Sequence, residues 1–141
     1  MSGKIEAPQF RETLGHYPTG VAVVMVVDER GQPDGMVVGT FSSVSLDPPL
    51  IAFFPAKNSA SFSRLRGART FCVNVLAADQ ESLCRRIATV GFGKFDGVAW
   101  RAAPRGSPIL DGSVCWIECT FEDVREGGDH FVVLGRVHDL G

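Results

Sequence analysis

Residues 35–50 read GMVVGTFSSVSLDPPL, and this stretch decides which fold the rest of the chain can adopt. It begins with the apolar residues 36–38 and stops at Asp47-Pro48-Pro49. Between these ends lie the small hydroxyl residues Thr40, Ser42, Ser43 and Ser45. A buried hydroxyl needs a hydrogen-bond partner, so a core strand does not usually carry four of them. We therefore predict a strand that is half barrel core and half the polar lining of a cofactor site.

The segments before this stretch predict one helix and one strand. Residues 7–15 suit a short helix, because Phe10 and Leu14 lie four positions apart on one face. Residues 21–27 read VAVVMVV, a β-branched run that is typical of a buried strand. The polar turn at residues 28–35 reverses the direction of the chain. We therefore expect the deciding stretch, residues 35–50, to pair antiparallel with that strand.

The segments after the stretch predict further strands and two helices. The expected strands are residues 50–54, 70–76, 114–124 and 131–140. The expected helices are residues 58–65, capped by Asn58 or Ser59, and residues 79–90, capped by Asp79. Loops or turns are expected at residues 91–97, 107–112 and 125–130. Because turns join most of these strands, we predict a mainly β fold, an antiparallel barrel with short helices at its edges, as one domain over residues 1–141.

Composition and charge exclude several classes of protein. The chain has 141 residues, of which 45% are hydrophobic, as expected for one globular domain with a core. Its net charge is −2 and it has no basic cluster, which argues against nucleic acid and anionic membranes as partners. The N-terminal sequence lacks the pattern of a signal peptide, and no apolar run approaches the ~20 residues that span a bilayer. We expect a cytoplasmic protein.

The cysteines and histidines give no sign of a metal site. Cys115 and Cys119 lie in a strand-like stretch, where they would be about 13 Å apart, too far for a disulfide or a shared metal. We expect all four cysteines, which include Cys72 and Cys84, to be reduced residues of the core. The chain also lacks a phosphate-binding loop and the HExxH and GxSxG motifs. An enzyme with these residues would take its reactivity from an organic cofactor.

Two polar clusters could bind a ligand. The segment Lys57-Asn58-Ser59, with Ser61, lies at an expected helix start, where hydroxyls, N–H groups and one ammonium suit a phosphate. The same residues make an ordinary helix cap, and this segment alone favours the cap. The second cluster is Gly127-Gly128-Asp129-His130, which by itself is most simply a hairpin turn with a glycine at positive φ. His130 is the candidate catalytic residue.

Six segments together resemble the flavin reductase-like family, which has the FMN-binding split-barrel fold. They are FRETLGHYPTGVAVV (residues 10–24), GMVVGTFSSVSLDPPL (35–50), KNSASFSRLR (57–66), FCVNVLAADQ (71–80), KFDGVAW (94–100) and GGDHFVVLGRV (127–137). The serine-rich strand closed by LDPPL is quite specific, and the GGDH turn follows in the expected order. The resemblance covers nearly the whole chain. It implies an antiparallel split barrel of Greek-key type.

The resemblance also implies a flavin site at the boundary of a homodimer. Residues 40–45 would hold the isoalloxazine ring and the ribityl chain, and the Lys57 segment would hold the phosphate. Phe95 would stack on a ligand, and His130 would lie beside the nicotinamide of NAD(P)H. The implied cofactor-binding residues are Pro18, Thr19, Gly20, Gly39, Thr40, Ser42, Ser43, Val44, Ser45, Lys57, Asn58, Ser59, Ser61, Phe95, Gly128 and Asp129.

The implied activity is an NAD(P)H:flavin oxidoreductase that passes hydride to FMN or FAD and supplies the reduced flavin to a partner monooxygenase. His130 would orient the nicotinamide, since hydride transfer itself needs no acid. The alternative is a protein that holds FMN without nicotinamide-dependent turnover, because one fold can host both functions. The sequence leaves open FMN or FAD, NADH or NADPH, bound cofactor or substrate, and the identity of the partner.

Three features depart from the family pattern. Val37 stands where the family often has threonine, and Gly39 stands where a side-chain hydroxyl or amide is common. Neither residue can donate a side-chain hydrogen bond to flavin, so backbone groups would have to bind it. The chain ends at Leu140-Gly141, inside an expected strand, whereas family members usually run further. We therefore expect the C-terminal edge of the barrel to be truncated in this chain.

Overall fold

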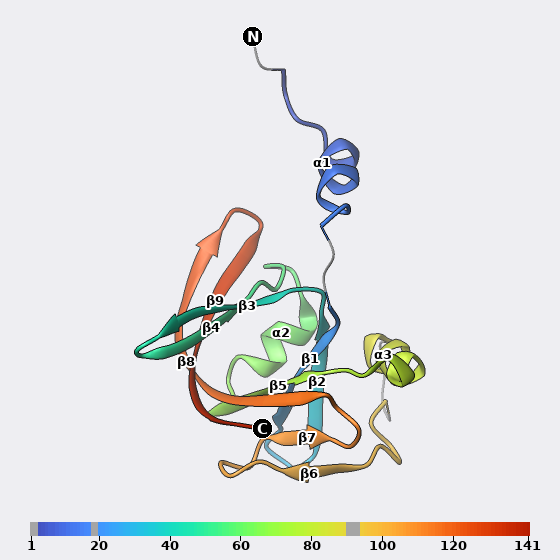
Figure 1. The fold of residues 1–141 in the computed structure, drawn as a ribbon, viewed down its shortest axis with the longest axis vertical. Coiled ribbons are helices and arrows are strands. Elements are labelled where there is room, and N and C mark those ends of the chain that lie inside the picture. Colours follow the sequence, from blue (N-terminus) through green and yellow to red (C-terminus); the bar gives the residue numbers. More distant parts are fainter. Residues whose placement is uncertain (1–2, 18–19, 90–93) are drawn as a thin grey trace.

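The computed structural model describes residues 3–17, 20–89 and 94–141, which contain nine β-strands and three α-helices (Figure 1). The helices are α1 (Ala7–Leu14), α2 (Ala60–Leu65) and α3 (Glu81–Ala88), and a 3₁₀ turn (Ala78–Gln80) precedes α3. The strands are β1 (Ala22–Val27), β2 (Pro33–Val38), β3 (Phe41–Leu46), β4 (Pro49–Phe53), β5 (Thr70–Val75), β6 (Trp100–Ala102), β7 (Pro108–Leu110), β8 (Cys115–Gly127) and β9 (His130–Leu140). The predicted mainly β fold is confirmed.

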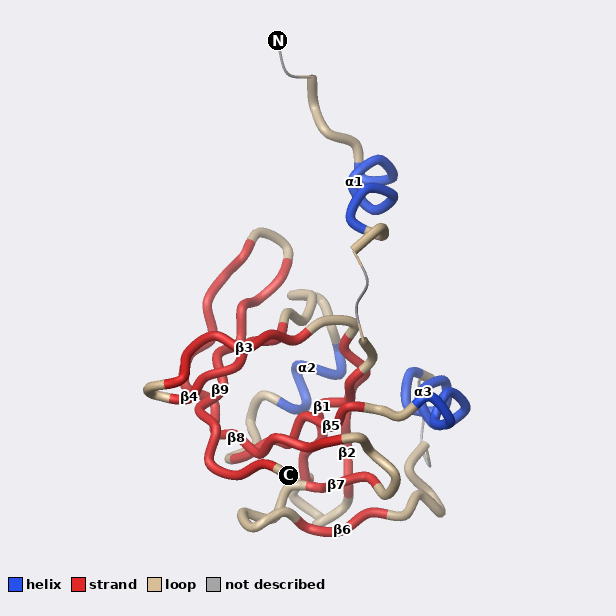
Figure 2. Tube along the Cα trace, in the orientation of Figure 1, coloured by secondary structure: helices blue, strands red, loops and turns tan. Residues whose placement is uncertain are grey.

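Seven strands form one antiparallel sheet in the order β2-β1-β5-β8-β9-β4-β3, and β6 and β7 form a separate hairpin. The strands β2 and β3 are therefore opposite edges of the sheet, although only Gly39 and Thr40 separate them in the chain. Two linking residues span at most about 11 Å, so they bring the two edges close together. The sheet consequently curls into a barrel, as Figure 2 shows.

Residues 35–50 contribute to three strands, where the sequence predicted one strand before Asp47-Pro48-Pro49 and another over residues 50–54. The apolar start of this stretch belongs to β2, its serines belong to β3 and its Pro-Leu end belongs to β4. β2 pairs with β1 whereas β3 pairs with β4, so the hydrogen-bonded neighbour changes at the Gly39-Thr40 link. The expectation of one continuous strand before Asp47 is wrong for this reason, whereas the expected strand at residues 50–54 is confirmed as β4. The predicted antiparallel pairing with residues 21–27 is confirmed, since β2 pairs with β1.

Aromatic side chains fill the barrel interior. The centroid of the Phe53 ring lies 6.1 Å from that of Phe62 and 5.4 Å from that of Phe71, and both pairs meet edge to face. Phe62 belongs to α2, so this helix covers one end of the core with a buried side chain. Such aromatic pairs add to the stability that apolar burial alone provides.

The strand β1 is buried on both faces. Val24 packs into the aromatic core, whereas its neighbour Met25 packs with Ile87 of α3 on the other side of the sheet. Successive side chains of a strand point to opposite faces, so both faces of β1 need apolar residues. This requirement explains the unbroken apolar run at residues 21–27.

Several predicted boundaries differ from the structure. β6 and β7 were not predicted, because a strand of three residues carries too little periodicity to detect. β8 and β9 extend into the predicted loop at residues 125–130 and leave a tight turn in which Gly128 has a φ of 68°. Asp79 lies within the 3₁₀ turn, and the N-cap of α3 is Gln80. The predicted loop at residues 91–97 lies partly outside the described residues.

Buried polar side chains hold the β6–β7 hairpin against the main sheet. Both carboxylate oxygens of Glu118 on β8 accept backbone N–H groups, from Arg105 at 2.7 Å and from Ser107 at 2.9 Å. Asn74 on β5 hydrogen-bonds to the backbone at both ends of β7. Glu118 and Asn74 are fully buried, so these bonds satisfy groups that water cannot reach.

The cysteines are free, but the expectation that all four lie in the core is wrong for Cys84 and Cys115, which are half-buried near the surface. Cys72 and Cys119 are buried, and burial raises the pKa of each thiol to about 12, so neither is a thiolate near neutral pH. Cys115 and Cys119 both belong to β8, which confirms that they lie on one strand. Within the described residues, no group of histidine, cysteine and acidic side chains could hold a metal ion, and no helix is long and apolar enough to cross a membrane.

We expect Glu118→Gln to lower the free energy of unfolding by about 1–3 kcal/mol, because the new NH₂ group would face a backbone N–H and leave it without an acceptor. Urea denaturation at pH 7 measures this change. Glu29→Gln, in the exposed turn between β1 and β2, is the matched control and should change the free energy by less than about 0.5 kcal/mol. Equal stability of the two variants would show that Glu118 does not hold the hairpin.

Candidate functional site

A cleft of about 730 Å³ opens where the two edges of the sheet come together. It is lined by Phe10, Met36, Val37, Val38, Gly39, Thr40, Phe54, Pro55, Ala56, Ser59 and His130. Its volume lies within the range of small-molecule and cofactor sites, about 300–1,000 Å³. Four of the residues that the sequence proposed, Gly39, Thr40, Ser59 and His130, meet in this cleft.

The serines of the deciding stretch lie on β3, which begins directly after the cleft residue Thr40. β3 pairs only with β4 among the described strands, so the backbone N–H and C=O groups of its other side remain open. Ser42, Ser43 and Val44 are exposed, and Ser45 is half-buried. The register with β4 shifts between Ser43 and Ser45, which makes Val44 a bulge. Bulges at sheet edges often lie beside binding sites, where they end the pairing and redirect side chains.

The segment before α2 forms a regular helix cap. The Ser59 hydroxyl oxygen accepts the backbone N–H of Phe62 at 3.1 Å, as an N-cap residue should. Asn58 is exposed, and Ser61 is half-buried on the first turn of α2. The cap interpretation is therefore confirmed. Binding of a phosphate by the same residues stays a prediction.

The tip of the β8–β9 hairpin lies against this segment. The backbone N–H of Lys57 donates to the Asp129 carbonyl at 3.0 Å, and the N–H of Phe131 donates to the Pro55 carbonyl at 2.8 Å. The Lys57 ammonium also reaches Glu126 Oε1 at 3.1 Å. These contacts join the two polar clusters, which are far apart in the sequence, into one corner of the cleft.

His130 is the first residue of β9, and about half of its side chain is exposed. Its Nδ1 lies 2.8 Å from Asp129 Oδ1. The hydrogen bond and the charge of His130 lower the pKa of Asp129, so this carboxylate is ionised near neutral pH and can only accept a hydrogen bond. Nδ1 therefore carries the proton of this bond, and Nε2 remains available to a ligand in the cleft.

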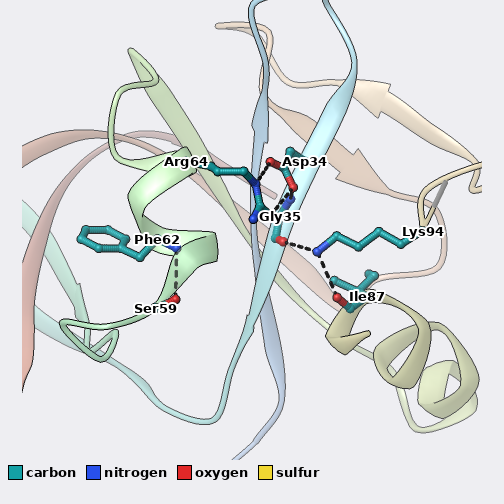
Figure 3. A network of polar contacts seen from close by, with 7 residues as sticks. All are labelled: Asp34, Gly35, Ser59, Phe62, Arg64, Ile87 and Lys94. Carbon is teal, nitrogen blue, oxygen red and sulfur yellow. Dashed lines mark hydrogen bonds and ion pairs between the residues drawn. The ribbon is translucent and has the colours of Figure 1, made fainter. Parts of the chain in front are cut away.

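Polar contacts hold β2, which forms one wall of the cleft (Figure 3). Arg64 on α2 donates from Nε and Nη2 to the two carboxylate oxygens of Asp34 on β2, at 3.0 and 3.2 Å. Lys94 donates to the Gly35 carbonyl on β2 and to the Ile87 carbonyl on α3, each at 3.2 Å. Because β2 is an edge strand, these contacts replace a second neighbouring strand in fixing its position.

Of the predicted site residues that the structure describes, Phe95 and the serines of β3 are not among those that line the cleft. Phe95 is half-buried and packs against the second core cluster, beside Met25. Gly35 permits this approach, because a Cβ there would lie 2.5 Å from Met25 Sδ and 3.4 Å from the Phe95 ring. Stacking of Phe95 on a ligand stays a prediction. Gly20 is exposed before β1, and Pro18-Thr19 lies outside the described residues.

A family model described as "Flavin reductase like domain" matches residues 14–141. The chain belongs to this family. A flavin reductase from Pseudomonas putida is 46% identical to this flavin reductase domain over 136 residues, which are 96% of this chain and 80% of the relative. The reductase subunit of a flavin-dependent monooxygenase from Rhodococcus jostii is 43% identical over 136 residues, which are 96% of this chain and 69% of the relative.

A solved structure of the same family has the same fold. The NADH:FAD oxidoreductase of Streptomyces globisporus, in complex with NAD and FAD fragments, matches this flavin reductase domain with a TM-score of 0.88 at 36% identity. The match covers 99% of this chain and 86% of that one. The resemblance carried by the six sequence segments is confirmed, and so is the antiparallel split barrel.

The corner and the cleft of this flavin reductase domain include residues that the sequence did not propose as site residues. Phe10 and Phe54 line the cleft, and Glu126 pairs with Lys57. Phe54 follows the buried Phe53, so the alternation of a strand could have predicted that it points outward. Phe10 and Glu126 gave no local signal, because their role depends on where α1 and the hairpin tip lie in space.

We expect Asp34→Asn to lower the free energy of unfolding by about 1 kcal/mol at pH 7, because the half-exposed Arg64 loses a two-bond ion pair. Burial raises the pKa of Asp34, but the bonds and charges of Arg64, Gly35 and Lys94 outweigh it and hold this pKa below its usual range. The carboxylate therefore stabilises the fold above its unfolded pKa of about 3.9 and loses this effect as the pH falls further.

The difference in free energy of unfolding between the original chain and Asp34→Asn should thus be largest at pH 7 and should decrease below about pH 4. Urea denaturation at pH 7 and pH 3 measures it. Asp28→Asn, in the exposed turn before β2, is the control: it tests whether loss of any carboxylate changes the free energy of unfolding in the same way. A difference for Asp34→Asn that is the same at both pH values would contradict the role given to the ion pair.

Proposed function

We propose that the chain is an NAD(P)H-dependent flavin reductase, which transfers hydride to FMN or FAD and supplies the reduced flavin to a partner monooxygenase. One observation carries this proposal: His130, Ser59 and the Gly39-Thr40 link meet in a single cleft although they are distant in sequence. Membership of the flavin reductase family and the names of the relatives support the activity. The complex of the Streptomyces enzyme with NAD and FAD fragments supports the choice of ligands.

The cleft suits a flavin in size and in the distribution of its groups. Met36 and Phe54 offer apolar surface to a ring, and the open edge of β3 offers backbone donors beside it. Ser59 lines the cleft, and Lys57 and Asn58 directly precede it in the chain, so a phosphate would bind at this end. When bound, the flavin supplies the redox chemistry by accepting a hydride from NAD(P)H.

The side chains of this chain bind and orient the two substrates. The backbone N–H groups of residues 40–45 would stabilise negative charge that develops on the flavin ring. In the neutral imidazole of His130, Asp129 holds the proton on Nδ1, so Nε2 can accept a hydrogen bond from the nicotinamide carboxamide. The apolar residues of β2 keep water away from the reacting rings. No step requires a nucleophile from the chain.

We also propose that the chain forms a homodimer in the cytoplasm. Its monooxygenase partner would receive the reduced flavin by diffusion. The edge strand β3 exposes 95% of Leu46 and 50% of Val44, an apolar surface that a second copy of the chain would cover. The relative from Rhodococcus jostii is, by its name, the reductase subunit of a flavin-dependent monooxygenase. This name supports a partner of the same class for this chain.

An anaerobic mixture of the purified protein with NADH or NADPH and with FMN or FAD tests the proposal. We expect the absorbance of the oxidised flavin to fall for at least one pair, far faster than in the same mixture without protein. No bleaching with any pair would contradict the proposed function. A yellow protein that neither nicotinamide bleaches would instead establish the alternative, a protein that holds flavin without turnover.

We expect His130→Ala to raise KM for the nicotinamide about fivefold or more and KM for the flavin less than about twofold, because a hydrogen bond to the nicotinamide is lost. Steady-state kinetics with each substrate varied in turn measure both values. His138→Ala is the matched control, since His138 lies on the same strand and bonds to Thr120 at 2.8 Å outside the cleft. An equal rise for both substrates would contradict the place given to His130.

A further inference from the structure

The Lys57 ammonium, to which the proposed function assigns the flavin phosphate, already has an anionic neighbour. Its Nζ lies 3.1 Å from Glu126 Oε1, and the Glu126 side chain is 77% exposed. Glu126 pairs across the hairpin with Phe131, and Lys57 lies 5.9 Å from the centre of the Phe131 ring. A phosphate oxygen that accepts a hydrogen bond from Nζ would therefore lie roughly 4–6 Å from the Glu126 carboxylate.

The other charged groups at this corner do not cancel the effect of Glu126. Arg66, the residue that follows α2, lies 5.1 Å from the centre of the same Phe131 ring and adds one positive charge. Asp129 adds a second carboxylate, which His130 holds at 2.8 Å. The two cations and the two carboxylates balance, so the corner offers no excess positive charge to a strongly charged anion.

We propose that Glu126 is a specificity-determining residue that disfavours a doubly charged phosphate, and so weakens the binding of FMN relative to FAD. This inference rests on the proposed function. The phosphate of FMN is a monoester, which carries about −1.5 to −2 charges at pH 7. Each phosphate of the FAD diphosphate carries about one negative charge, and riboflavin has no phosphate. Repulsion by Glu126 therefore increases from riboflavin to FAD to FMN.

The size of the effect follows from the charges and their separation. Two unit charges about 5 Å apart at an exposed site in 0.1 M salt change a binding constant by about twofold. Glu126→Gln should therefore strengthen FMN binding about fivefold and FAD binding about twofold, and leave riboflavin binding unchanged. The gain for FMN should nearly disappear in 1 M salt, where charges are screened within about 3 Å.

Equilibrium dialysis of riboflavin, FMN and FAD against the purified full chain and its variants tests this inference. Glu122→Gln is the matched control, because it removes the same charge from the same strand at a residue that pairs with Arg136 at 3.3 Å. We expect the ratio of FMN to riboflavin affinity to rise about fivefold in Glu126→Gln and to stay constant in Glu122→Gln. Lys57→Gln should lower the same ratio.

The possible results separate the inference from the proposed function. An unchanged ratio in Glu126→Gln, with flavin bound, overturns the inference and leaves the reductase assignment standing. An equal rise in Glu122→Gln also overturns it, since the net charge and not the position of Glu126 would then be responsible. Binding of none of the three flavins by the original chain overturns both. Glu126 is exposed, so we expect its variant to unfold at the same urea concentration as the original chain.

Discussion

The short link Gly39-Thr40 is the constraint on which the rest of the structure depends. It joins β2 and β3, which are the two edges of a seven-stranded sheet, and so forces the sheet to curl until these edges approach each other. β2 and β3 are not paired with each other, so their outer backbone groups stay open where the cleft lies. The change of partner at the link therefore creates both the barrel and the site.

The long β8–β9 hairpin completes the site from the other side. Its strands of 13 and 11 residues extend beyond the sheet, and its tip bonds to the backbone on both sides of Ala56. The turn is tight because Gly128 adopts a positive φ, which glycine alone adopts without strain. The first residue after the turn is His130, and the pairing of the tip sets where its ring lies. A loose loop at residues 125–130 would not have fixed this position.

Paired charges rather than an excess of positive charge lie on the elements that surround the cleft. Lys57 pairs with Glu126, and Arg64 pairs with Asp34. The first pair lies where we propose that the flavin phosphate binds, whereas the second fixes α2 against β2. A chain with a net charge of −2 has little long-range attraction for an anionic ligand, so recognition depends on local geometry. The position of single carboxylates can then decide which anion binds best.

The sequence by itself determined the features that depend on local preferences. The β-branched run at residues 21–27, the Ser59 cap and the turn glycine Gly128 each act over a few residues, and the structure has all three. The family motifs also indicated the antiparallel barrel, but the order of its strands came from the structure. The tertiary structure decided which residues share the cleft, because strand pairing joins segments far apart in the chain. It alone broke the deciding stretch at Gly39-Thr40, where the strand changes its pairing partner, and placed Glu126 against Lys57.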